Sequence, residues 1–347
     1  MTISPGGPFI GARRTAGTVR QDPMQGKSDR KNLFVKDIRA GGAVRSTFLV
    51  TEKNTAFTQK GTPYINLRLR DRTGDVDGKI WDNADVLDKR FRKGDVVHVV
   101  GRAVSYRDTL QVTISEITKA DGAGFRPEDY LPSSKEDIDE MFEAFTGCIA
   151  TVEDPWLRAL LEAFFSDETF VLRFKRAPAA KGFHHAYIGG LLEHTLSTVK
   201  LLDMVARHYP MIRRDLLITG GILHDIGKIA EFDYDGMIDY STEGRLVGHI
   251  VMSVEMLDSK IAGIENFPPA LAMELKHILV SHHGETEFGS PKRPKTVEAL
   301  VIHMVDDLDA KIHAFHEFIE GSGEADSEWT AFHRFFERFL YKGKTGA

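Results

Sequence analysis

The chain of 347 residues contains a single cysteine, Cys148. No intramolecular disulfide can form, and a cysteine-rich zinc site is excluded, so any metal site must use His, Asp and Glu. This cysteine usage predicts a reducing, cytoplasmic location. No apolar run reaches the roughly 18 residues needed to span a bilayer, and no signal-peptide pattern begins the sequence. A membrane partner is therefore not expected.

Residues 1–30 contain glycine, proline and arginine but few apolar residues. This composition predicts a disordered tail. Arg13, Arg14 and Arg20 leave a transit peptide as the alternative, although Pro5 and Pro8 argue against a long amphipathic helix there.

Charge is unevenly distributed around a net value of -6. Residues 31–120 contain 17 Lys and Arg against 11 Asp and Glu, whereas residues 121–347 carry a net charge of -15. The basic segment could attract a polyanion and the acidic segment could hold cations, with ordinary solvated surface as the alternative.

Residues 31–120 have the pattern of a small β-domain. Strand-like alternation covers about 44–50, 64–70, 76–81, 96–104 and 110–117, and a short helical piece lies around Ala84 to Phe91. Three strands, a helix and two strands is the order of a five-stranded Greek-key barrel, and the segment resembles the OB-fold nucleic-acid-binding domains.

An OB domain binds single-stranded nucleic acid by stacking bases on aromatic rings and pairing phosphates with basic side chains. The candidate stacking residues are Tyr64, Trp81 and Tyr106, although aromatics in a small barrel also serve as core. The candidate phosphate contacts are Arg68, Arg70, Arg72, Lys79, Arg102 and Arg107.

Residues 121–136 contain glycine, proline and serine and are interpreted as a linker. Beyond it, residues 137–347 show a period of 3.6 and predict an all-α domain. The expected helices cover about 137–147, 154–165, 186–208, 212–224, 245–260, 269–282, 295–319 and 327–341.

Histidines and aspartates recur at informative places on these helices. His194 shares a face with core leucines, a His224-Asp225 pair ends the next helix, and His249 lies in the helix that follows. His282 and His283 end a further helix, and Asp306, Asp307 and Asp309 lie in the long helix after it. Together imidazole and carboxylate suit divalent transition metals. Periodicity alone does not choose among the three last aspartates.

Several motifs of the helical segment together resemble those of a known enzyme superfamily. Phe174–Gly182, His184–Thr195, Ser281–Gly284 and Ile302–Ala310, together with the His-Asp pair, resemble the HD-domain phosphohydrolase superfamily, which is all-helical and metal-dependent. The OB segment followed by this domain is most similar to the YhaM-type 3′→5′ exoribonucleases. The resemblance implies hydrolysis of phosphodiester bonds in single-stranded nucleic acid, with RNA favoured over DNA.

By resemblance, the first metal is held by His194, His224, Asp225 and Asp306. A second would be completed by His249, His282 and His283, with Asp225 bridging the two. One or two divalent ions are expected, Mn²⁺ by resemblance, with Fe, Ni or Co as alternatives.

The remaining roles follow from what phosphodiester hydrolysis requires. Asp225 would hold the attacking water and Lys228 would reach the phosphate as a point charge. Arg173, Lys175, Arg176 and Lys181 would form a basic strip that guides the nucleic-acid backbone, unless they are ordinary solvated residues. His184 and His185 would contact substrate or support the metal ligands.

Three other functions stay open at this point. The first is hydrolysis of small nucleotides, which the OB segment disfavours. The second is cleavage of cyclic dinucleotides, which the run after His283 disfavours because it lacks a Gly-Tyr-Pro signature. The third is a non-catalytic RNA-binding protein, which the intact set of ligands disfavours. A homo-oligomer is a further hypothesis, since the aromatic helix at 327–341 could pack against a second copy or within its own domain.

Overall fold

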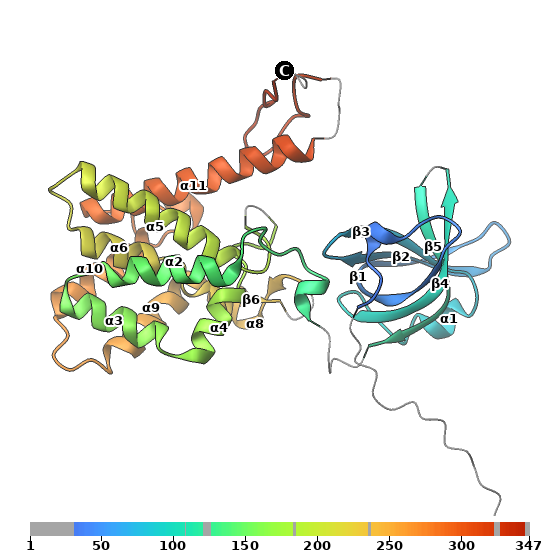
Figure 1. Cartoon of the computed structure of the whole chain (residues 1–347), viewed down its shortest axis with the longest axis horizontal. Coiled ribbons are helices and arrows are strands. Elements are labelled where there is room, and N and C mark those ends of the chain that lie inside the picture. The colour runs from blue at the N-terminus through green and yellow to red at the C-terminus, as the bar shows by residue number, and fades with distance from the viewer. Residues whose placement is uncertain are drawn as a thin grey trace, which may run out of the picture.

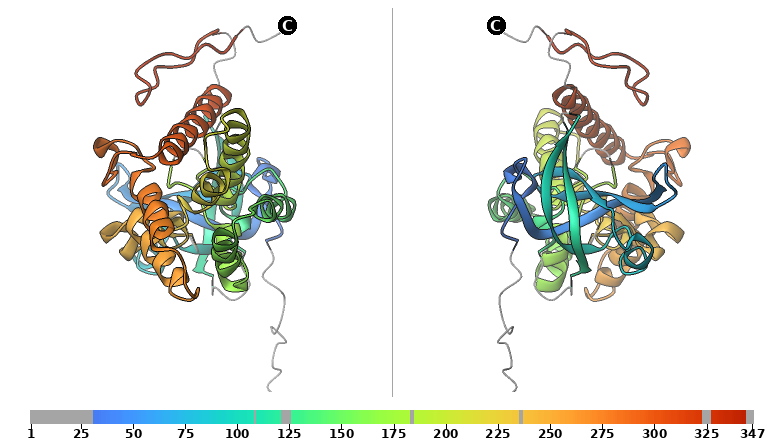
Figure 2. Two further views of the ribbon diagram at one scale, coloured as in Figure 1. Left: turned by 90° about the vertical axis from the view of Figure 1, so that its left-hand side faces the viewer. Right: turned by 90° about the vertical axis from the view of Figure 1, so that its right-hand side faces the viewer.

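The computed structural model describes residues 31–107, 109–120, 126–182, 185–234, 237–322 and 327–343. A closed β-barrel and a helical region lie side by side along the long axis of the molecule (Figure 1). Figure 2 shows the same two parts end on, with the helices toward the viewer in one view and the barrel in the other. The predicted fold class is confirmed. The predicted tail, residues 1–30, lies outside the described residues.

The barrel closes in the strand order β1-β2-β3-β5-β4. Its strands are β1 (Ala43–Phe57), β2 (Pro63–Asp71), β3 (Gly74–Ile80), β4 (Val96–Tyr106) and β5 (Thr109–Lys119). A one-turn helix α1 (Ala84–Leu87) separates β3 from β4, and a 3-10 turn η1 (Val35–Asp37) precedes β1. The pairing of β3 with β5 is parallel and the others are antiparallel, as closure of a Greek-key barrel requires.

Strand β1 borders two neighbours because it is long and irregular. Its first half pairs with β4 and its second half with β2, and the register shifts between Val50 and Glu52. Such a bulge bends a strand and increases its twist, which lets β1 turn the corner of the barrel. Val44, Phe48 and Val50 point inward and are buried in the barrel core.

The helical region is built from ten helices within the part of the chain that the structure describes. They are α2 (Ile138–Ala150), α3 (Pro155–Phe165), α4 (Glu168–Arg176), α5 (Gly190–His208), α6 (Arg214–Leu223), α7 (Lys228–Glu231), α8 (Thr242–Leu246), α9 (His249–Ile261), α10 (Pro269–Ser281) and α11 (Val297–Gly321). Short pieces β6 (Phe232–Asp233), β7 (Asp239–Tyr240), η2 (Pro127–Asp129) and η3 (Thr286–Phe288) connect them. Asp137, Asp154 and Asp167 cap α2, α3 and α4 through backbone N–H groups. Across the described helices, length and apolarity nowhere combine in a way that would allow a membrane crossing.

Helix α6 is the buried centre of the helical region. Every residue from Leu216 to Leu223 is buried. A Cβ at Gly220 would lie 2.8 Å from Ile302 Cδ1, and one at Gly221 would lie 2.3 Å from Leu202 Cδ1. The two glycines therefore allow α5 and α11 to approach closely, which fixes where α6 ends and where the next side chains point.

The prediction of a helix over residues 327–341 is wrong. The structure has isolated bridges between Trp329 and Tyr341 and between His333 and Arg338, so this segment doubles back on itself. It extends beyond the end of α11 (Figure 1), and most of its aromatic side chains are exposed. A short amphipathic helix is marginal unless its apolar face is packed, and here little of the domain covers that face. The expected contact with a second copy stays a prediction.

The described end of the predicted linker is a packed junction between the two parts. Tyr130 is 1% exposed and belongs to one buried cluster with Leu49 and Val96 of the barrel and with Ile188, which precedes α5. Its hydroxyl lies 2.7 Å from Thr47 Oγ1. Ile188 N donates to Pro132 O, and Ser134 N donates to Ile188 O, both at 2.9 Å. The chain is therefore held at the point where it passes from barrel to helices.

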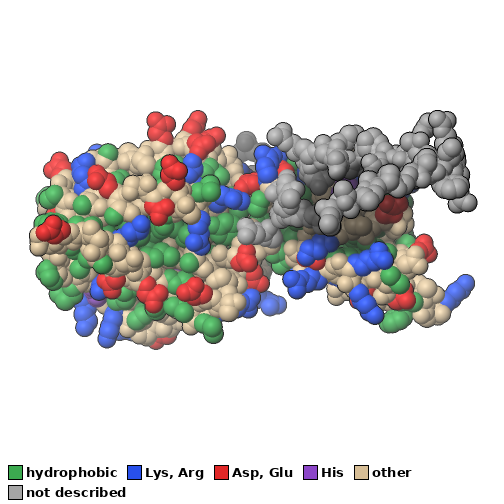
Figure 3. Space-filling model, turned by 90° about the horizontal axis from the view of Figure 1, so that it is seen from below, with side chains coloured by type: hydrophobic (Ala, Val, Ile, Leu, Met, Phe, Trp, Pro, Cys, Tyr) green, Lys and Arg blue, Asp and Glu red, His purple; other side chains and the backbone are tan. Residues whose placement is uncertain are grey.

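The surface reflects the uneven charge of the sequence. On the face shown in Figure 3, acidic and basic side chains are interspersed over the helical region. Lys and Arg predominate on the part of the barrel in view. A basic barrel is the surface expected to attract a polyanion.

Substitution of Tyr130 should loosen this junction. Tyr130→Phe removes one hydrogen bond and should cost about 1 kcal/mol of stability. Tyr130→Ala also leaves a cavity and should cost roughly 3–5 kcal/mol. Urea unfolding and limited proteolysis measure both effects. Tyr341→Ala is the control, because Tyr341 is exposed. A Tyr130→Ala protein as stable and protease-resistant as the parent would contradict this account of the junction.

Candidate metal centre

The predicted ligands come from five separate segments that meet at one place. His194 lies in α5, whereas His224 and Asp225 directly follow α6. His249 is the first residue of α9, His282 and His283 follow α10, and Asp306 lies within α11. Most of these side chains therefore leave the chain at helix ends, where the backbone can turn them toward a common point.

The first cluster consists of His194, His224 and Asp306, with one oxygen of Asp225. His194 Nε2 lies 3.2 Å from Asp306 Oδ1 and 3.3 Å from His224 Nε2. Asp225 Oδ2 lies 3.6 Å from His194 Nε2 and 3.4 Å from His224 Nε2. All four donor atoms thus face one another.

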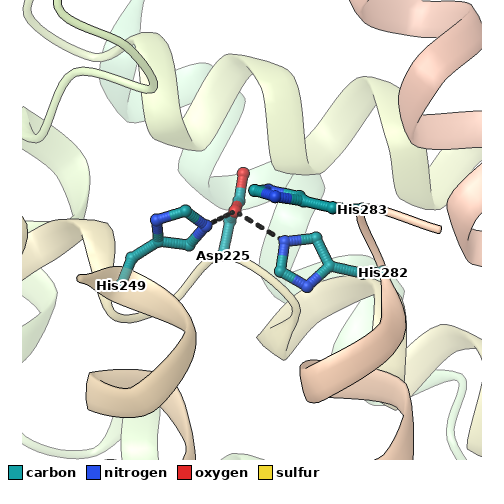
Figure 4. A group of neighbouring side chains, drawn as sticks. All are labelled: Asp225, His249, His282 and His283. Carbon is teal, nitrogen blue, oxygen red and sulfur yellow. Dashed lines mark ion pairs between the residues drawn. The ribbon is translucent and has the colours of Figure 1, made fainter. Parts of the chain in front are cut away.

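The second cluster consists of Asp225, His249, His282 and His283 (Figure 4). Here the other oxygen is used: Asp225 Oδ1 lies 3.5 Å from His249 Nε2 and 3.5 Å from His282 Nε2. The two oxygens of Asp225 therefore face different clusters. A carboxylate in this position can bridge two cations.

Hydrogen bonds to the opposite ring nitrogens fix the orientation of each imidazole. His224 Nδ1 donates to Gly221 O at 2.8 Å, and His282 Nδ1 donates to Leu279 O at 2.7 Å. A carbonyl only accepts, so Nδ1 carries a proton, and Nε2 is the ring nitrogen left to bind a metal.

The other histidines follow the same rule with different acceptors. His283 Nδ1 donates to Phe288 O at 2.9 Å. His194 Nδ1 lies 3.0 Å from Asp309 Oδ2, and His249 Nδ1 lies 3.0 Å from Glu231 Oε1. Orientation of a metal-binding histidine by a carbonyl or carboxylate is a common feature of metal sites.

The donor atoms fit divalent cations. Asp225 Oδ1, His249 Nε2 and His282 Nε2 are buried and have no hydrogen-bond partner among the described residues. Ligands about 2.1 Å from one ion lie about 3.0–3.4 Å from one another, close to the spacings of the first cluster. The HD domain implies divalent metal binding, and these residues have the chemistry for it.

The choice among the last three aspartates follows from their positions on α11. Asp306 faces His194 and His224. Asp307 pairs with Lys311 at 2.6 Å on the exposed side of the helix. Asp309 lies behind His194, on its Nδ1 side. Asp306 is therefore the one of the three that can join the first cluster.

Lys228 is held against Asp225 rather than exposed to solvent. Its Nζ lies 2.6 Å from Asp225 Oδ2, and the side chain is 13% exposed. Burial alone would raise the pKa of Asp225, but Lys228 and His224 hold that pKa well below its ordinary value. Burial would likewise lower the pKa of Lys228, yet Asp225 raises it above the ordinary value. The ammonium therefore stays charged beside the clusters.

His283 is a partly buried histidine of the second cluster. Burial and the neighbouring His282 lower its pKa to about 4. The ring is therefore neutral at physiological pH, which is the form that binds a metal.

The predicted basic strip is not a continuous surface. Arg173 and Arg176, three residues apart on α4, line one pocket, whereas Lys175 lies on another side of the helix. Arg173 Nη2 donates to Ile229 O, Lys175 pairs with Asp139 in α2, and Arg176 pairs with Glu128 beside the junction. Lys181 pairs with Asp239 at 2.7 Å. The sequence missed α4 itself, although Asp167 caps it.

His185 does not lie on a substrate surface. Its side chain is fully buried, with Nδ1 2.7 Å from the Tyr187 hydroxyl and Nε2 3.8 Å from Asp309 Oδ2. The predicted substrate contact is therefore replaced by a supporting position behind the first cluster. His184 lies outside the described residues.

The barrel carries an exposed group of aromatic rings around one lysine. Tyr64 and Trp81 stack with centroids 4.7 Å apart, and Lys79 Nζ lies within 5.8 Å of the ring centroids of Tyr64, Trp81 and Tyr106. Trp81 is 40% and Tyr106 54% exposed, so neither belongs to the barrel core. We refer to Tyr64, Lys79, Trp81 and Tyr106 as the aromatic–lysine platform.

The arginines beside the platform are already paired. A groove of about 570 Å³ crosses the outer face of β1, β2 and β3 and is lined by Asn66, Arg68, Arg70 and Lys79, among others. Arg68 pairs with Asp77 at 2.7 Å, and Arg70 pairs with Asp75 at 2.6 Å. Their charge is therefore largely neutralised across the strands.

The other predicted phosphate contacts are dispersed. Arg72 lies over the ring of Phe34, and Arg102 Nε donates to Gly41 O at 3.0 Å. Arg107 lies 5.4 Å from the centroid of Tyr106, next to the platform.

Two residues of the centre have roles that the sequence does not reveal. Glu231 accepts from both the backbone N and Nδ1 of His249. Asp309, which the sequence offers only as a possible metal ligand, instead faces His194 Nδ1. The spacing of residues in the sequence does not point to Glu231. It reaches His249 because α7, α8 and the short strands between them fold the chain back on itself.

Comparison with known proteins agrees with both parts. The family model for the HD domain matches residues 191–311, and the model for the OB-fold nucleic acid binding domain matches residues 44–120. Among solved structures, the second OB-fold domain of replication protein A from Methanococcus maripaludis is 20% identical and covers 26% of this chain and 94% of that chain, with a TM-score of 0.22.

Longer matches come from curated relatives. The 3′-5′ exoribonuclease YhaM of Listeria welshimeri is 32% identical over 289 residues, which cover 82% of this chain and 90% of that protein. The protein of the same name from Bacillus velezensis is 33% identical over 283 residues, which cover 81% and 88% respectively. Since these matches extend over nearly the whole of the relatives, the chain belongs to the family of the 3′-5′ exoribonuclease YhaM.

Proposed function

We propose that this protein is a metal-dependent 3′→5′ exoribonuclease that hydrolyses single-stranded RNA. The observation that carries the proposal is the position of Asp225, whose two oxygens face two separate clusters of metal-binding side chains. The nucleic-acid-binding type of the barrel supports a polymeric substrate. The names of the relatives support RNA as substrate and cleavage from the 3′ end.

A small number of groups would share the steps of phosphodiester hydrolysis. Divalent ions bound at the two clusters would supply Lewis acidity, which activates water and neutralises charge on the phosphate. Asp225 and the six other ligands hold that charge in a buried place. Asp225 also accepts a hydrogen bond from an attacking water. Lys228, beside Asp225 Oδ2, donates to a non-bridging phosphate oxygen as negative charge develops there.

The identity of the metal is part of the proposal. The donor set is five imidazoles and two carboxylates, with thiolates excluded because Cys148 lies elsewhere. This set suits Mn²⁺, Fe²⁺, Co²⁺ and Ni²⁺. We expect Mn²⁺ to be the ion that supports activity.

Hydrolysis of labelled polymers tests the activity. With Mn²⁺ present, 5′-labelled single-stranded RNA should give a ladder that shortens from the 3′ end, faster than the matching DNA. Asp225→Ala should lower the rate at least 1,000-fold, about the effect of removing a central catalytic group. A chelator should abolish the activity and added Mn²⁺ should restore it.

Asp307→Asn is the matched control for this experiment, because Asp307 is an exposed aspartate on α11 that pairs with Lys311 and belongs to neither cluster. It should retain the parental rate. Failure of metal-loaded protein to cleave either polymer would overturn the proposal and favour a small nucleotide as substrate.

Replacement of Lys228 separates phosphate stabilisation from substrate binding. Lys228→Met should lower kcat by about 100–1,000-fold, since one donor to the developing charge is lost. KM should change little because the ammonium acts mainly in the transition state. The amount of bound metal, measured on the same protein, should stay at the parental level. An unchanged kcat would remove Lys228 from the catalytic group.

The aromatic–lysine platform can be tested by binding. Trp81→Ala should raise the Kd for single-stranded RNA about 5–150-fold, because one base loses its stacking partner. Hydrolysis of a small phosphodiester that cannot reach the barrel should be unaffected. Tyr341→Ala, an exposed aromatic outside the barrel, is the control. Equal Kd values for Trp81→Ala and the parent would show that bases do not stack there.

A further inference from the structure

The five histidines of the two clusters differ in what orients them. Three donate Nδ1–H to backbone carbonyls, of Gly221, Leu279 and Phe288. The other two, His194 and His249, face the carboxylates of Asp309 and Glu231 at 3.0 Å. One of these two histidines belongs to the first cluster and one to the second. Each cluster thus has one histidine oriented by a negative charge.

A carboxylate behind an imidazole has an effect that a carbonyl lacks. It orients the ring and also makes the far nitrogen a stronger donor, because the charge stabilises a proton or cation on the other side of the ring. The ligand atom that each acid influences is distinct: Asp309 acts on His194 Nε2 and Glu231 acts on His249 Nε2.

Both acids are built firmly into the fold. Asp309 is 3% exposed, and its Oδ1 accepts a hydrogen bond from Ser197 Oγ, which lies about one turn after His194 on α5. Glu231 is 6% exposed, and its Oε1 also accepts from His249 N at 2.9 Å. The two acids lie on different helices, α11 and α7, and contact different histidines.

We propose that Asp309 and Glu231 are positioning residues that each set the metal affinity of one cluster, Asp309 that of the first and Glu231 that of the second. This inference rests on the proposed function, since it presumes that the clusters hold ions. It implies that the affinity of the two positions can be changed one at a time without touching a ligand.

Manganese binding to the full-length protein tests the assignment. Binding is measured by competition with a chelating dye and by the paramagnetic resonance spectrum of Mn²⁺, which distinguishes an isolated ion from a coupled pair. The parent should bind two ions. Asp309→Asn and Glu231→Gln should each weaken one ion about 10–100-fold, so that limiting Mn²⁺ gives the signal of an isolated ion.

The conservative variants keep the contribution of the hydrogen bond separate from that of the charge. Asn and Gln retain an oxygen that accepts from Nδ1–H, whereas Asp309→Ala and Glu231→Ala remove it, so the alanine variants should bind more weakly still. Asp307→Asn, on the exposed side of α11 where Asp307 pairs with Lys311, is the control and should bind like the parent. Circular dichroism checks that each variant folds.

A double-variant cycle identifies which ion each acid serves. Asp306→Ala removes a ligand of the first cluster and should leave one ion. In that background Asp309→Asn should have no further effect, whereas Glu231→Gln should still weaken the remaining ion about 10–100-fold.

The outcomes separate the two proposals. A parent protein that binds no metal would overturn the proposed function and this inference together. A parent that binds two ions, with Asp309→Asn and Glu231→Gln unchanged, would overturn only the inference. Equal weakening of both ions by either variant would also overturn it, because the effect would then be general and not confined to one cluster.

Discussion

The site depends on one buried carboxylate that must face two ways. Asp225 is 2% exposed, and its oxygens are separately directed to His194 and His224 on one side and to His249 and His282 on the other. A rotation of this side chain would break both clusters at once. Its position follows from α6, which is buried from Leu216 to its end at Leu223, directly before His224. The tight contacts of Gly220 and Gly221 fix that end, so backbone packing sets the geometry of the metal centre.

The junction links the polymer-binding part to the same centre. Tyr130 fills the space between barrel and helices, and Ser134 Oγ donates to Glu193 Oε2 at 2.6 Å, beside His194. The barrel is therefore held near the helix that carries a first-cluster ligand and is not attached only by a loose tether. For an enzyme that shortens a polymer, a fixed position of the binding surface relative to the hydrolytic centre is useful, because a nucleic acid bound to the barrel is then held in one orientation toward that centre.

The sequence allowed the prediction of both fold types, because period-two and period-3.6 patterns are strong in β1 to β5 and in the long helices. It failed at 327–341, where aromatic spacing suits a helix but the domain offers little surface to bury it. The partners of the basic residues were not readable from the sequence either. Arg68, Arg70, Lys175 and Lys181 are candidate substrate contacts, and each also meets an acid that lies on another strand or element. Ligand types were readable from the residues. Glu231 was not, since its contact with His249 exists only in three dimensions.

The arrangement of the centre implies that cations belong to the stable form of the protein. In the first cluster, His194 Nε2 and His224 Nε2 are 3.3 Å apart, and both rings use Nδ1 as donor. Burial alone would lower the pKa of His224, but Asp225 and Asp306 raise that pKa to about 10, so this pair of rings favours a positive charge. In the second cluster, buried donor atoms of Asp225, His249 and His282 lack hydrogen bonds among the described residues, which costs free energy. Ion binding supplies the positive charge that the first cluster favours and the contacts that the second cluster lacks, so metal affinity and folding stability are coupled.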